Sequence, residues 1–442
     1  MAADHRREGT GVDAMSAIEK AAFLKENSAY NKAWFESVRR QVADGQPFAF
    51  VNVDTPTEIF KAMGIPVVVN QWWASICSAK QRGPAYLRAI TDKGYRDGLC
   101  SYCSMAFGSV IAEDDDKPWG GLPKPTILVT NNDCGSKRKI FELWGARENI
   151  PVFILEHPIL DDPIRCNAAD LRHDWERLIG ARQIDYLAAQ YRELITLLER
   201  LTNRQFDTAR FEEVMRLVNE QEEEYARARD LIGETRPAPM NVIEQMPATM
   251  VPQWHRGTEW GVERARLFRE EVERRISAEE ATCPGEQHRL MWLGRGLWHN
   301  LPFYRHFEQS RGAVFVWSVY LAIASDGYPR YGGDPLRALA SRMLGIFALV
   351  QEVPFVTDWY VQEARRAGIN GVIRMGDDRG GCRPLFGRRH LVDEALEAAG
   401  IPVLLISGDA VDPRAWDEVR LSARIEEFIE TRLAPIEPRN PQ

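Results

Sequence analysis

Two cysteines of this chain occupy positions at which α/β proteins build reactive sites. Cys134 comes four residues after an apolar run that ends at Thr130, and Cys382 follows another such run, which ends at Met375. Ligands bind at the carboxyl ends of strands in open α/β sheets, so both thiols are expected at such an edge. Cysteine thiolates hold zinc ions and iron–sulfur clusters. If the two runs belong to two lobes, the thiols can face each other across the cleft between the lobes.

A third thiol could come from the single CxxC pair, at residues 100–103. Cys100 begins a helix candidate, and the N–H groups at the start of a helix favour a thiolate. One CxxC pair alone could also be redox-active, or could contain a buried thiol without a chemical role. Three other cysteines are expected to be packed thiols: Cys77, Cys166 and Cys283.

The elements that would position these thiols form two blocks of short β-branched runs separated by helical stretches. This alternation predicts two parallel sheets with crossover helices, and hence two doubly wound, Rossmann- or flavodoxin-like α/β lobes. The expected strands are Phe48–Val53, Val67–Val69, Thr126–Thr130 and Val152–Leu155 in the first block, and Leu290–Leu293, Val314–Trp317, Val372–Met375 and Val403–Ile406 in the second. The expected helices include Trp34–Ala43, Lys137–Trp144, Pro335–Leu349, His390–Ala399 and Trp416–Leu433.

Between the two blocks lies a charged segment with helical periodicity. Its apolar residues from Leu187 to Leu201 recur at alternating spacings of four and three, which predicts one buried helix face. A second helix follows Phe206, so the segment is expected to form a helical hairpin, with Glu222, Glu223 and Glu224 facing solvent. The expected organisation is an N-terminal arm (1–30), a first lobe (31–167), the hairpin (168–236), a linker and active-site segment (237–284), a second lobe (285–433) and a tail (434–442).

Bulk composition excludes several classes of function. The chain has 442 residues, of which 45% are apolar, and a net charge of -8, so an affinity for nucleic acid is not expected. The start has no apolar core of a secretory signal, and no stretch approaches the roughly 18 apolar residues of a membrane helix. These features predict a cytoplasmic protein without a membrane partner, whose cysteines are thiols or metal ligands rather than disulfides.

The residues around the three thiols resemble a known family. The chain contains, in order, GLCSYCSMAFG, ILVTNNDCGSKRKIFELW, RMGDDRGGCRPLFG and ISGDAVDPRAW. These phrases are similar in order and spacing to the cysteine regions and the C-terminal motif of the benzoyl-CoA reductase / 2-hydroxyacyl-CoA dehydratase family. The resemblance implies a 4Fe–4S cluster in the cleft, with Cys100, Cys134 and Cys382 as ligands and one open iron. Cys103 could replace Cys100 as a ligand, and the double-cubane cluster proteins of this family are an alternative.

The resemblance also implies partners. Members of the family receive low-potential electrons from an ATP-hydrolysing activator, for which ferredoxin is the upstream donor, and pair with a homologous second subunit. This chain has no GxxxxGKS/T phosphate loop, so the ATP step would belong to a partner. Three functions are open: reduction of the aromatic ring of an acyl-CoA, dehydration of a 2-hydroxyacyl-CoA, and electron transfer to another chain.

Several features favour ring reduction. The segment from Trp254 to Trp260, WHRGTEW, resembles the larger cluster-binding (B) subunit of ATP-dependent benzoyl-CoA reductases more than the dehydratase subunits. The 13 tryptophans would suit a flat aromatic acyl group, although most of them could equally be core residues. Family members commonly have an acidic residue after the second strand, where this chain reads Val69-Asn70-Gln71-Trp72. This departure disfavours a dehydratase that depends on the acid.

Ring reduction requires a proton donor. His255 and His299 are the candidates, because imidazole titrates near neutral pH and both lie in polar, loop-like sequence. Glu259 could orient one of them, although such histidines are often only surface hydrogen-bonding groups. A group of basic residues beside the thiols could bind CoA phosphates or form a solvated face: Lys137, Arg138, Lys139, Arg383, Arg388 and Arg389.

Overall fold

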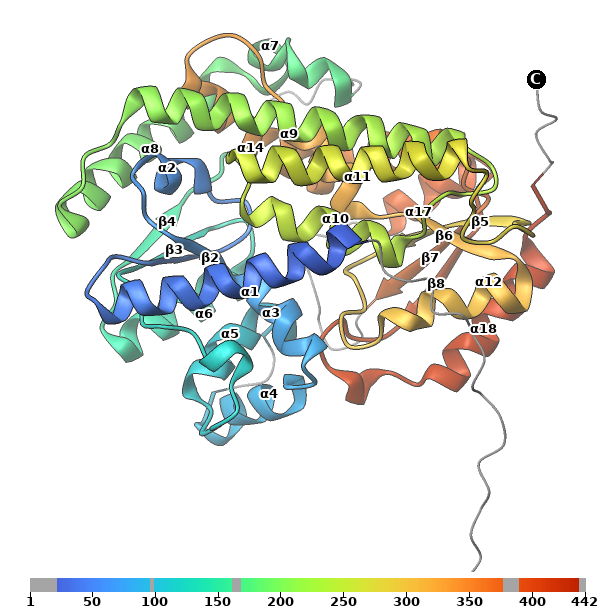
Figure 1. The fold of residues 1–442 in the computed structure, drawn as a ribbon, viewed down its shortest axis with the longest axis horizontal. Helices are drawn as coiled ribbons and strands as arrows, with labels where there is room; N and C mark the ends of the chain where they lie inside the picture. Colours follow the sequence, from blue (N-terminus) through green and yellow to red (C-terminus); the bar gives the residue numbers. More distant parts are fainter. Residues whose placement is uncertain (1–21, 96–98, 161–167, 377–388, 437–442) are drawn as a thin grey trace, which may run out of the picture.

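The computed structural model describes residues 22–95, 99–160, 168–376 and 389–436, and contains two four-stranded parallel sheets (Figure 1). The first sheet has the order β2-β1-β3-β4 and the second has the order β6-β5-β7-β8. The strands are β1 (Ala49–Val51), β2 (Val67–Val69), β3 (Ile127–Asn131), β4 (Val152–Leu155), β5 (His288–Leu293), β6 (Ala313–Trp317), β7 (Gly371–Gly376) and β8 (Val403–Ser407). The predicted α/β class and the eight predicted strands are therefore confirmed.

The two sheets have equivalent topology. In each sheet the chain passes from its first strand to a neighbour on one side, then crosses to the other side for the third strand. The order therefore reverses between β1 and β3 in one lobe, and between β5 and β7 in the other. Such a switch point opens a crevice at the carboxyl ends of the strands, because the loops there diverge to opposite faces of the sheet.

Helices cover both faces of the sheets. In the first half of the chain they are α1 (Ala22–Ala43), α2 (Thr57–Ala62), α3 (Asn70–Ala79), α4 (Gly83–Asp92), α5 (Ser101–Ile111), α6 (Gly135–Glu148), α7 (Trp175–Ile179), α8 (Ala181–Thr202) and α9 (Thr208–Glu234). In the second half they are α10 (Val242–Trp254), α11 (Glu259–Ser277), α12 (His306–Arg311), α13 (Val319–Gly327), α14 (Pro335–Gln351), α15 (Phe355–Arg366), α17 (Arg389–Ala398) and α18 (Glu418–Arg432). Short 3-10 turns lie at Pro118–Gly120, Ala168–Arg172, Leu301–Arg305 and Pro413–Ala415.

The predicted helical hairpin consists of α8 and α9. Asp207 begins α9 by accepting a hydrogen bond from the Arg210 N–H (3.0 Å), as an N-cap residue does. The apolar face predicted for α8 is buried, from Leu187 to Leu198. α9 packs against α2 of the first lobe and against α13 and α15 of the second, and α11 runs beside it (Figure 1). The hairpin therefore joins the lobes.

Three expectations about exposure and boundaries need correction. Glu222 is fully buried rather than solvent-facing, because its carboxylate lies against Gln253 of α10 and near the buried side chains of Arg256 and Arg342. The segment expected as a linker after residue 236 is packed, with Ala238 and Met240 fully buried. α1 begins at Ala22, so the last residues of the expected N-terminal arm are helical.

The apolar core is shared by the two lobes. Val51 and Val129 belong to a cluster that continues into Leu293 and Val314 of the second sheet, on the side of α8 and α14. Phe50 lies on the opposite face and belongs to a second cluster, which also spans both lobes. Because each cluster crosses from one lobe to the other, it fixes the position of one sheet's crevice relative to the other's.

Within the described ranges no single helix is long and apolar enough to cross a membrane. α14 and α15 reach that length and composition only when taken together, and they are bent by 77° relative to each other.

Candidate functional site

A pocket of about 550 Å³ lies where the carboxyl ends of the two sheets meet. The first lobe contributes the loop after β1, the start of α3 and residues of α5 and α6. The second lobe contributes Arg295 after β5, and residues of α13 and α14; α9 and α10 close the remaining side. Both topological switch points thus open into one cavity, as the placement of the thiols in the sequence predicts.

Two of the predicted thiols line this pocket. Cys134 is the N-cap residue of α6 and Cys103 lies in the first turn of α5; both are buried and are lining residues. Cys100, the N-cap residue of α5, accepts a hydrogen bond from the guanidinium of Arg295 (3.3 Å), which itself lines the pocket. A hydrogen bond from Cys103 and the charge of Arg295 lower the pKa of Cys100 to about 5 against the effect of burial.

The thiols suit a cluster of iron and sulfide. Their positions at the N-termini of α5 and α6, and the Arg295 guanidinium, provide the positive electrostatic environment that thiolate ligands require. Cys382 and Cys166 lie outside the described residues, and among those residues no three histidine, cysteine, aspartate or glutamate side chains converge as a metal site. The described part of the chain therefore provides thiols from the first lobe, and the ligand expected from the second lobe is not described.

Amide side chains occupy the end of β2. Gln71 accepts a hydrogen bond from the Val53 N–H (2.8 Å) and donates to Asn52 Oδ1 (2.8 Å). The same amide nitrogen is 3.9 Å from the sulfur of Cys103. After β2 this chain therefore has a neutral donor beside a thiol.

Asp54 supplies a carboxyl from the neighbouring strand end. It lines the pocket in the loop after β1, and its Oδ2 lies 3.8 Å from the ammonium of Lys137, which also pairs with Asp133. Burial raises the pKa of Asp54 to about 6, although Lys137 opposes the shift. Sequence reasoning missed this residue, but the signal was present, because Asp54 directly follows a predicted strand in the same way that Cys134 follows β3.

Aromatic side chains form part of the wall of the same pocket. Trp72 and Trp254 both line the pocket, with ring centroids 3.5 Å apart, and Trp34 contacts Trp72 edge-on. Tyr102 and Tyr320 add two more aromatic lining residues. The prediction that some tryptophans lie near the site therefore holds for Trp72 and Trp254, whereas Trp73 and Trp292 are core residues.

His255 and Glu259 lie outside the lining of the pocket. His255 is buried rather than in a polar loop: the rings of Tyr30, Trp34 and Trp260 surround it, and its Nε2 lies 3.1 Å from Asn31 Oδ1. Burial, together with the charge of Lys61, lowers its pKa well below the usual range. Glu259 is exposed at the first residue of α11. The geometry thus does not bring these two residues together at the pocket.

His299 also lies outside this lining. Its Nε2 lies 3.1 Å from the carbonyl oxygen of Asp409, and its ring packs against Trp416. Burial lowers its pKa.

Of the basic residues expected to bind CoA, Lys137 is buried in the pocket, whereas Arg138 and Lys139 are exposed and pair with Glu142. Arg383, Arg388 and the side chain of Arg389 lie outside the described part of the chain.

A buried ionic cluster lies beside the pocket and shares Arg256 with its lining. Glu58 Oε1 accepts hydrogen bonds from Arg256 Nε and Arg342 Nη1, both at 3.0 Å, and Arg256 in turn lies over the ring of Tyr328. Because α2 carries Glu58 and α14 carries Arg342, the cluster joins the two lobes. Arg256 and Tyr328 both line the pocket, so the cluster determines the position of its wall.

Glu222 belongs to the edge of this cluster and makes the protein sensitive to pH. Gln253 donates to both of its carboxylate oxygens, and burial raises its pKa to about 8. A carboxyl whose pKa is raised in the folded state opposes folding increasingly as the pH rises from its unfolded pKa to its folded pKa. We expect Glu222→Gln to leave the melting temperature almost unchanged near pH 4.5 and to raise it progressively up to pH 8. Thermal unfolding of both proteins across this range checks the prediction, and equal shifts at all pH values would contradict it.

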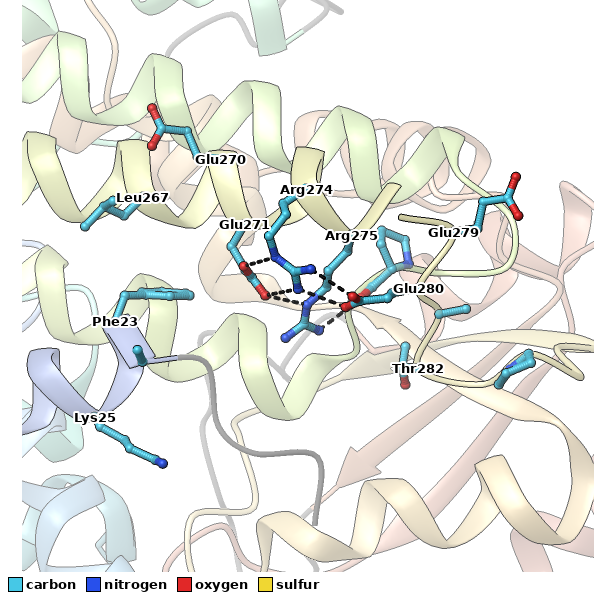
Figure 2. A pocket seen from close by; sticks show the side chains of 14 residues that line it. Phe23, Lys25, Leu267, Glu270, Glu271, Arg274, Arg275, Glu279, Glu280 and Thr282 are labelled. Carbon is cyan, nitrogen blue, oxygen red and sulfur yellow. Dashed lines mark hydrogen bonds and ion pairs between the residues drawn. The ribbon is translucent and has the colours of Figure 1, made fainter. Parts of the chain in front are cut away.

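A second, larger hollow lies away from the thiols. It measures about 1090 Å³ and lies between the start of α1 and the end of α11 (Figure 2). Both of its arginines pair with lining glutamates: Arg274 with Glu271 and Glu280, and Arg275 with Glu271. With its arginines paired in this way and neither sheet edge nor thiol in its lining, this hollow is not the candidate site.

Comparison with known proteins identifies the family. Residues 52–431 match the family model described as 2-hydroxyglutaryl-CoA dehydratase, D-component. The chain is 22% identical over 400 residues to the (R)-phenyllactyl-CoA dehydratase alpha subunit of Clostridium sporogenes, covering 88% of this chain and 90% of that protein. It is 24% identical over 372 residues to a benzoyl-CoA reductase subunit of Thauera aromatica, covering 79% and 80%.

The match to the family model covers most of the chain and includes both sheets and the pocket between them. The two relatives are aligned over most of their own length, so the likeness concerns the whole two-lobed unit. The predicted family is thereby confirmed, and the chain belongs to the family of the 2-hydroxyglutaryl-CoA dehydratase D-component.

Proposed function

We propose that this chain is the cluster-carrying subunit of an ATP-dependent aryl-CoA reductase of the benzoyl-CoA reductase type. The observation that carries the proposal is the pocket itself, which is lined both by buried thiols and by an aromatic wall built around Trp72 and Trp254. Flat aromatic rings pack favourably against such a wall. The likeness to the benzoyl-CoA reductase of Thauera aromatica supports the same assignment.

Cys100, Cys134 and Cys382 would hold a 4Fe–4S cluster, with Cys103 as the substitute for Cys100. When bound, such a cluster supplies electrons one at a time and an open coordination position. The chain's own residues orient the acyl thioester: the tryptophans pack against its ring, and the Gln71 amide is a donor within reach of the same space. The hydrophobic walls exclude water from the site, which strengthens every polar contact within it.

The proposed function requires partners. The chain has no phosphate-binding loop, so an ATP-hydrolysing activator, itself reduced by ferredoxin, would deliver the electrons. The names of several relatives describe them as subunits, which supports a complex with a homologous second subunit.

A second candidate is a 2-hydroxyacyl-CoA dehydratase subunit. It is favoured by the likeness to the (R)-phenyllactyl-CoA dehydratase alpha subunit, because the acyl group in that protein's name also carries an aromatic ring. The aromatic wall suits either acyl group. The amide of Gln71 lies where the resemblance to the family implies an acid, and this departure favours the reductase. A third candidate is an electron-transfer or double-cubane protein of the same family.

Electron paramagnetic resonance distinguishes these candidates. The protein is purified without oxygen together with its partner subunits, reduced, and measured alone, with benzoyl-CoA and with phenyllactyl-CoA. We expect the spectrum to change with benzoyl-CoA only, because an aromatic thioester then lies beside the cluster. A change with phenyllactyl-CoA only would assign the chain to the dehydratases. A spectrum that responds to neither compound would favour electron transfer.

A further inference from the structure

The pocket contains few groups that can transfer a proton at neutral pH. Lys61 of α2 lines the pocket with a pKa lowered to about 8, chiefly by burial, but its ammonium donates to the Trp254 carbonyl oxygen (3.3 Å). Among the described lining residues, only Asp54 and Glu213 carry carboxyls, and none is a histidine. Glu213 lies near the start of α9, where it is half-exposed and forms two hydrogen bonds with Arg216, at 2.6 and 2.7 Å. Asp54 lies at the end of the central strand β1, on the wall that also carries Cys134 and Lys137. It is therefore the carboxyl closest to the chemistry expected of the pocket.

The backbone at Asp54 is held in an uncommon conformation. Its φ of 65° lies in the left-handed region, which costs free energy for a residue other than glycine and persists where the surroundings impose it. The Asn131 side chain, at the end of β3, donates to the Asp54 carbonyl oxygen (3.4 Å). This contact ties the loop after β1 to the strand that precedes Cys134. The turn thereby holds the carboxyl at the switch point between β1 and β3.

Charged groups on several elements face this carboxyl. The Nζ of Lys137, in α6, lies 3.8 Å from the Asp54 carboxylate and also pairs with Asp133. Arg256 and Tyr328, which line the same pocket, also interact electrostatically with Asp54. Burial and Asp133 raise the pKa of Asp54 to about 6, and Lys137 and Arg256 oppose them. A carboxyl in this environment changes between its acid and base forms near neutral pH, as a general acid must.

We propose that Asp54 is the acid–base residue of this pocket, and that it donates a proton to the acyl group of the aryl-CoA substrate. The step rests on the proposed function. Reduction of the ring takes up two electrons and two protons. A low-potential iron–sulfur donor supplies the electrons one at a time, and Asp54 supplies one proton, so that the O–H bond of its carboxyl breaks and a C–H bond on the ring forms; the second proton comes from solvent. A solvent proton then restores the acid. The adjacent Lys137 ammonium stabilises the carboxylate left after the transfer.

The test uses the assembled complex with benzoyl-CoA and the variants Asp54→Asn, Asp54→Glu and Asp44→Asn. Asp54→Asn is expected to lower the rate of ring reduction about 100-fold or more, within the range that removal of a general acid produces. Its iron content and its dissociation constant for benzoyl-CoA should stay within threefold of the wild type. Asp54→Glu should recover part of the rate. Asp44, exposed just after α1, provides the matched control, and Asp44→Asn should match the wild type.

Dependence on pH gives a second readout that a purely structural role would not change. The wild-type rate should fall as the pH rises through about 6, because Asp54 then loses its proton, and the residual rate of Asp54→Asn should not show this fall. A rate of Asp54→Asn within threefold of the wild type overturns the proposal.

A third readout does not require turnover. If the wild type fails to reduce benzoyl-CoA, the proposed function fails, but infrared difference spectra of wild type against Asp54→Asn still decide the role of Asp54. A carboxyl that titrates near 6 supports the assignment. Titration at the ordinary aspartate value, about 4, overturns it.

Discussion

Cys134→Ser is expected to lose most of its iron and all activity. Cys134 is buried, begins α6 and lines the pocket shared by both sheets, so its thiolate would face the cluster directly. A serine hydroxyl in its place has a much higher pKa than a thiol and is a poor ligand for the soft iron of a cluster. Iron content per chain and the visible absorption of the protein, purified without oxygen, measure the effect.

The matched control is Cys283→Ser. Cys283 is also buried, but it does not line the pocket, and it donates a hydrogen bond to the Glu308 carbonyl oxygen, which serine can retain. This variant should keep its iron. Comparison of Cys100→Ser with Cys103→Ser then decides which thiol of α5 is a ligand. Full iron content and activity in Cys134→Ser would show that the ligand assignment is wrong.

Glu58→Gln is expected to lower the free energy of unfolding by about 3–5 kcal/mol, the usual cost of removing one partner of a buried ionic group. Burial by itself would raise the pKa of Glu58, but Arg256 and Arg342 reverse the shift and hold the pKa below its usual range. With the charge of Glu58 removed, both guanidinium groups remain buried without their counter-ion. The loss should be largest at neutral pH and should shrink as the pH falls through the folded-state pKa, since the wild-type carboxylate then becomes protonated.

Urea unfolding of both proteins at pH 7 and at lower pH measures this difference. Glu36→Gln provides the comparison, because Glu36 forms an exposed i,i+4 pair with Lys32 that contributes little to stability. If Glu58→Gln unfolds at the same urea concentration as Glu36→Gln, the cluster does not hold the lobes together as described.

Local sequence predicted the elements well, because it contains their causes. The predicted bounds of β2, Val67–Val69, and β4, Val152–Leu155, match the structure, since a β-branched run after Ile-Pro can form little else. The buried face of α8 followed from its spacing alone. The repeated alternation of strand and helix likewise predicted two parallel sheets.

Packing across elements is where sequence reasoning failed. A run of three glutamates is ordinarily solvated, and only contacts with distant segments, such as Gln253 of α10 and Arg342 of α14, bury Glu222. A histidine beside arginine and glutamate in the sequence suggested a polar setting, yet His255 is enclosed by aromatic rings from α1 and α11. Periodicity indicates which face of a helix is buried, but it does not indicate which partner buries it.

By itself, then, the sequence determined the two parallel sheets, the family and the place of Cys134 after β3, because these depend on local pattern and on spacing along the chain. Only the tertiary structure decided which side chains share the pocket. It places Asp54 beside Lys137, Arg295 beside Cys100, and Trp72 against Trp254, pairs that come together through crossover connections and the contact of two lobes. Such contacts depend on how the faces of separate elements meet, and that information is not local in the chain.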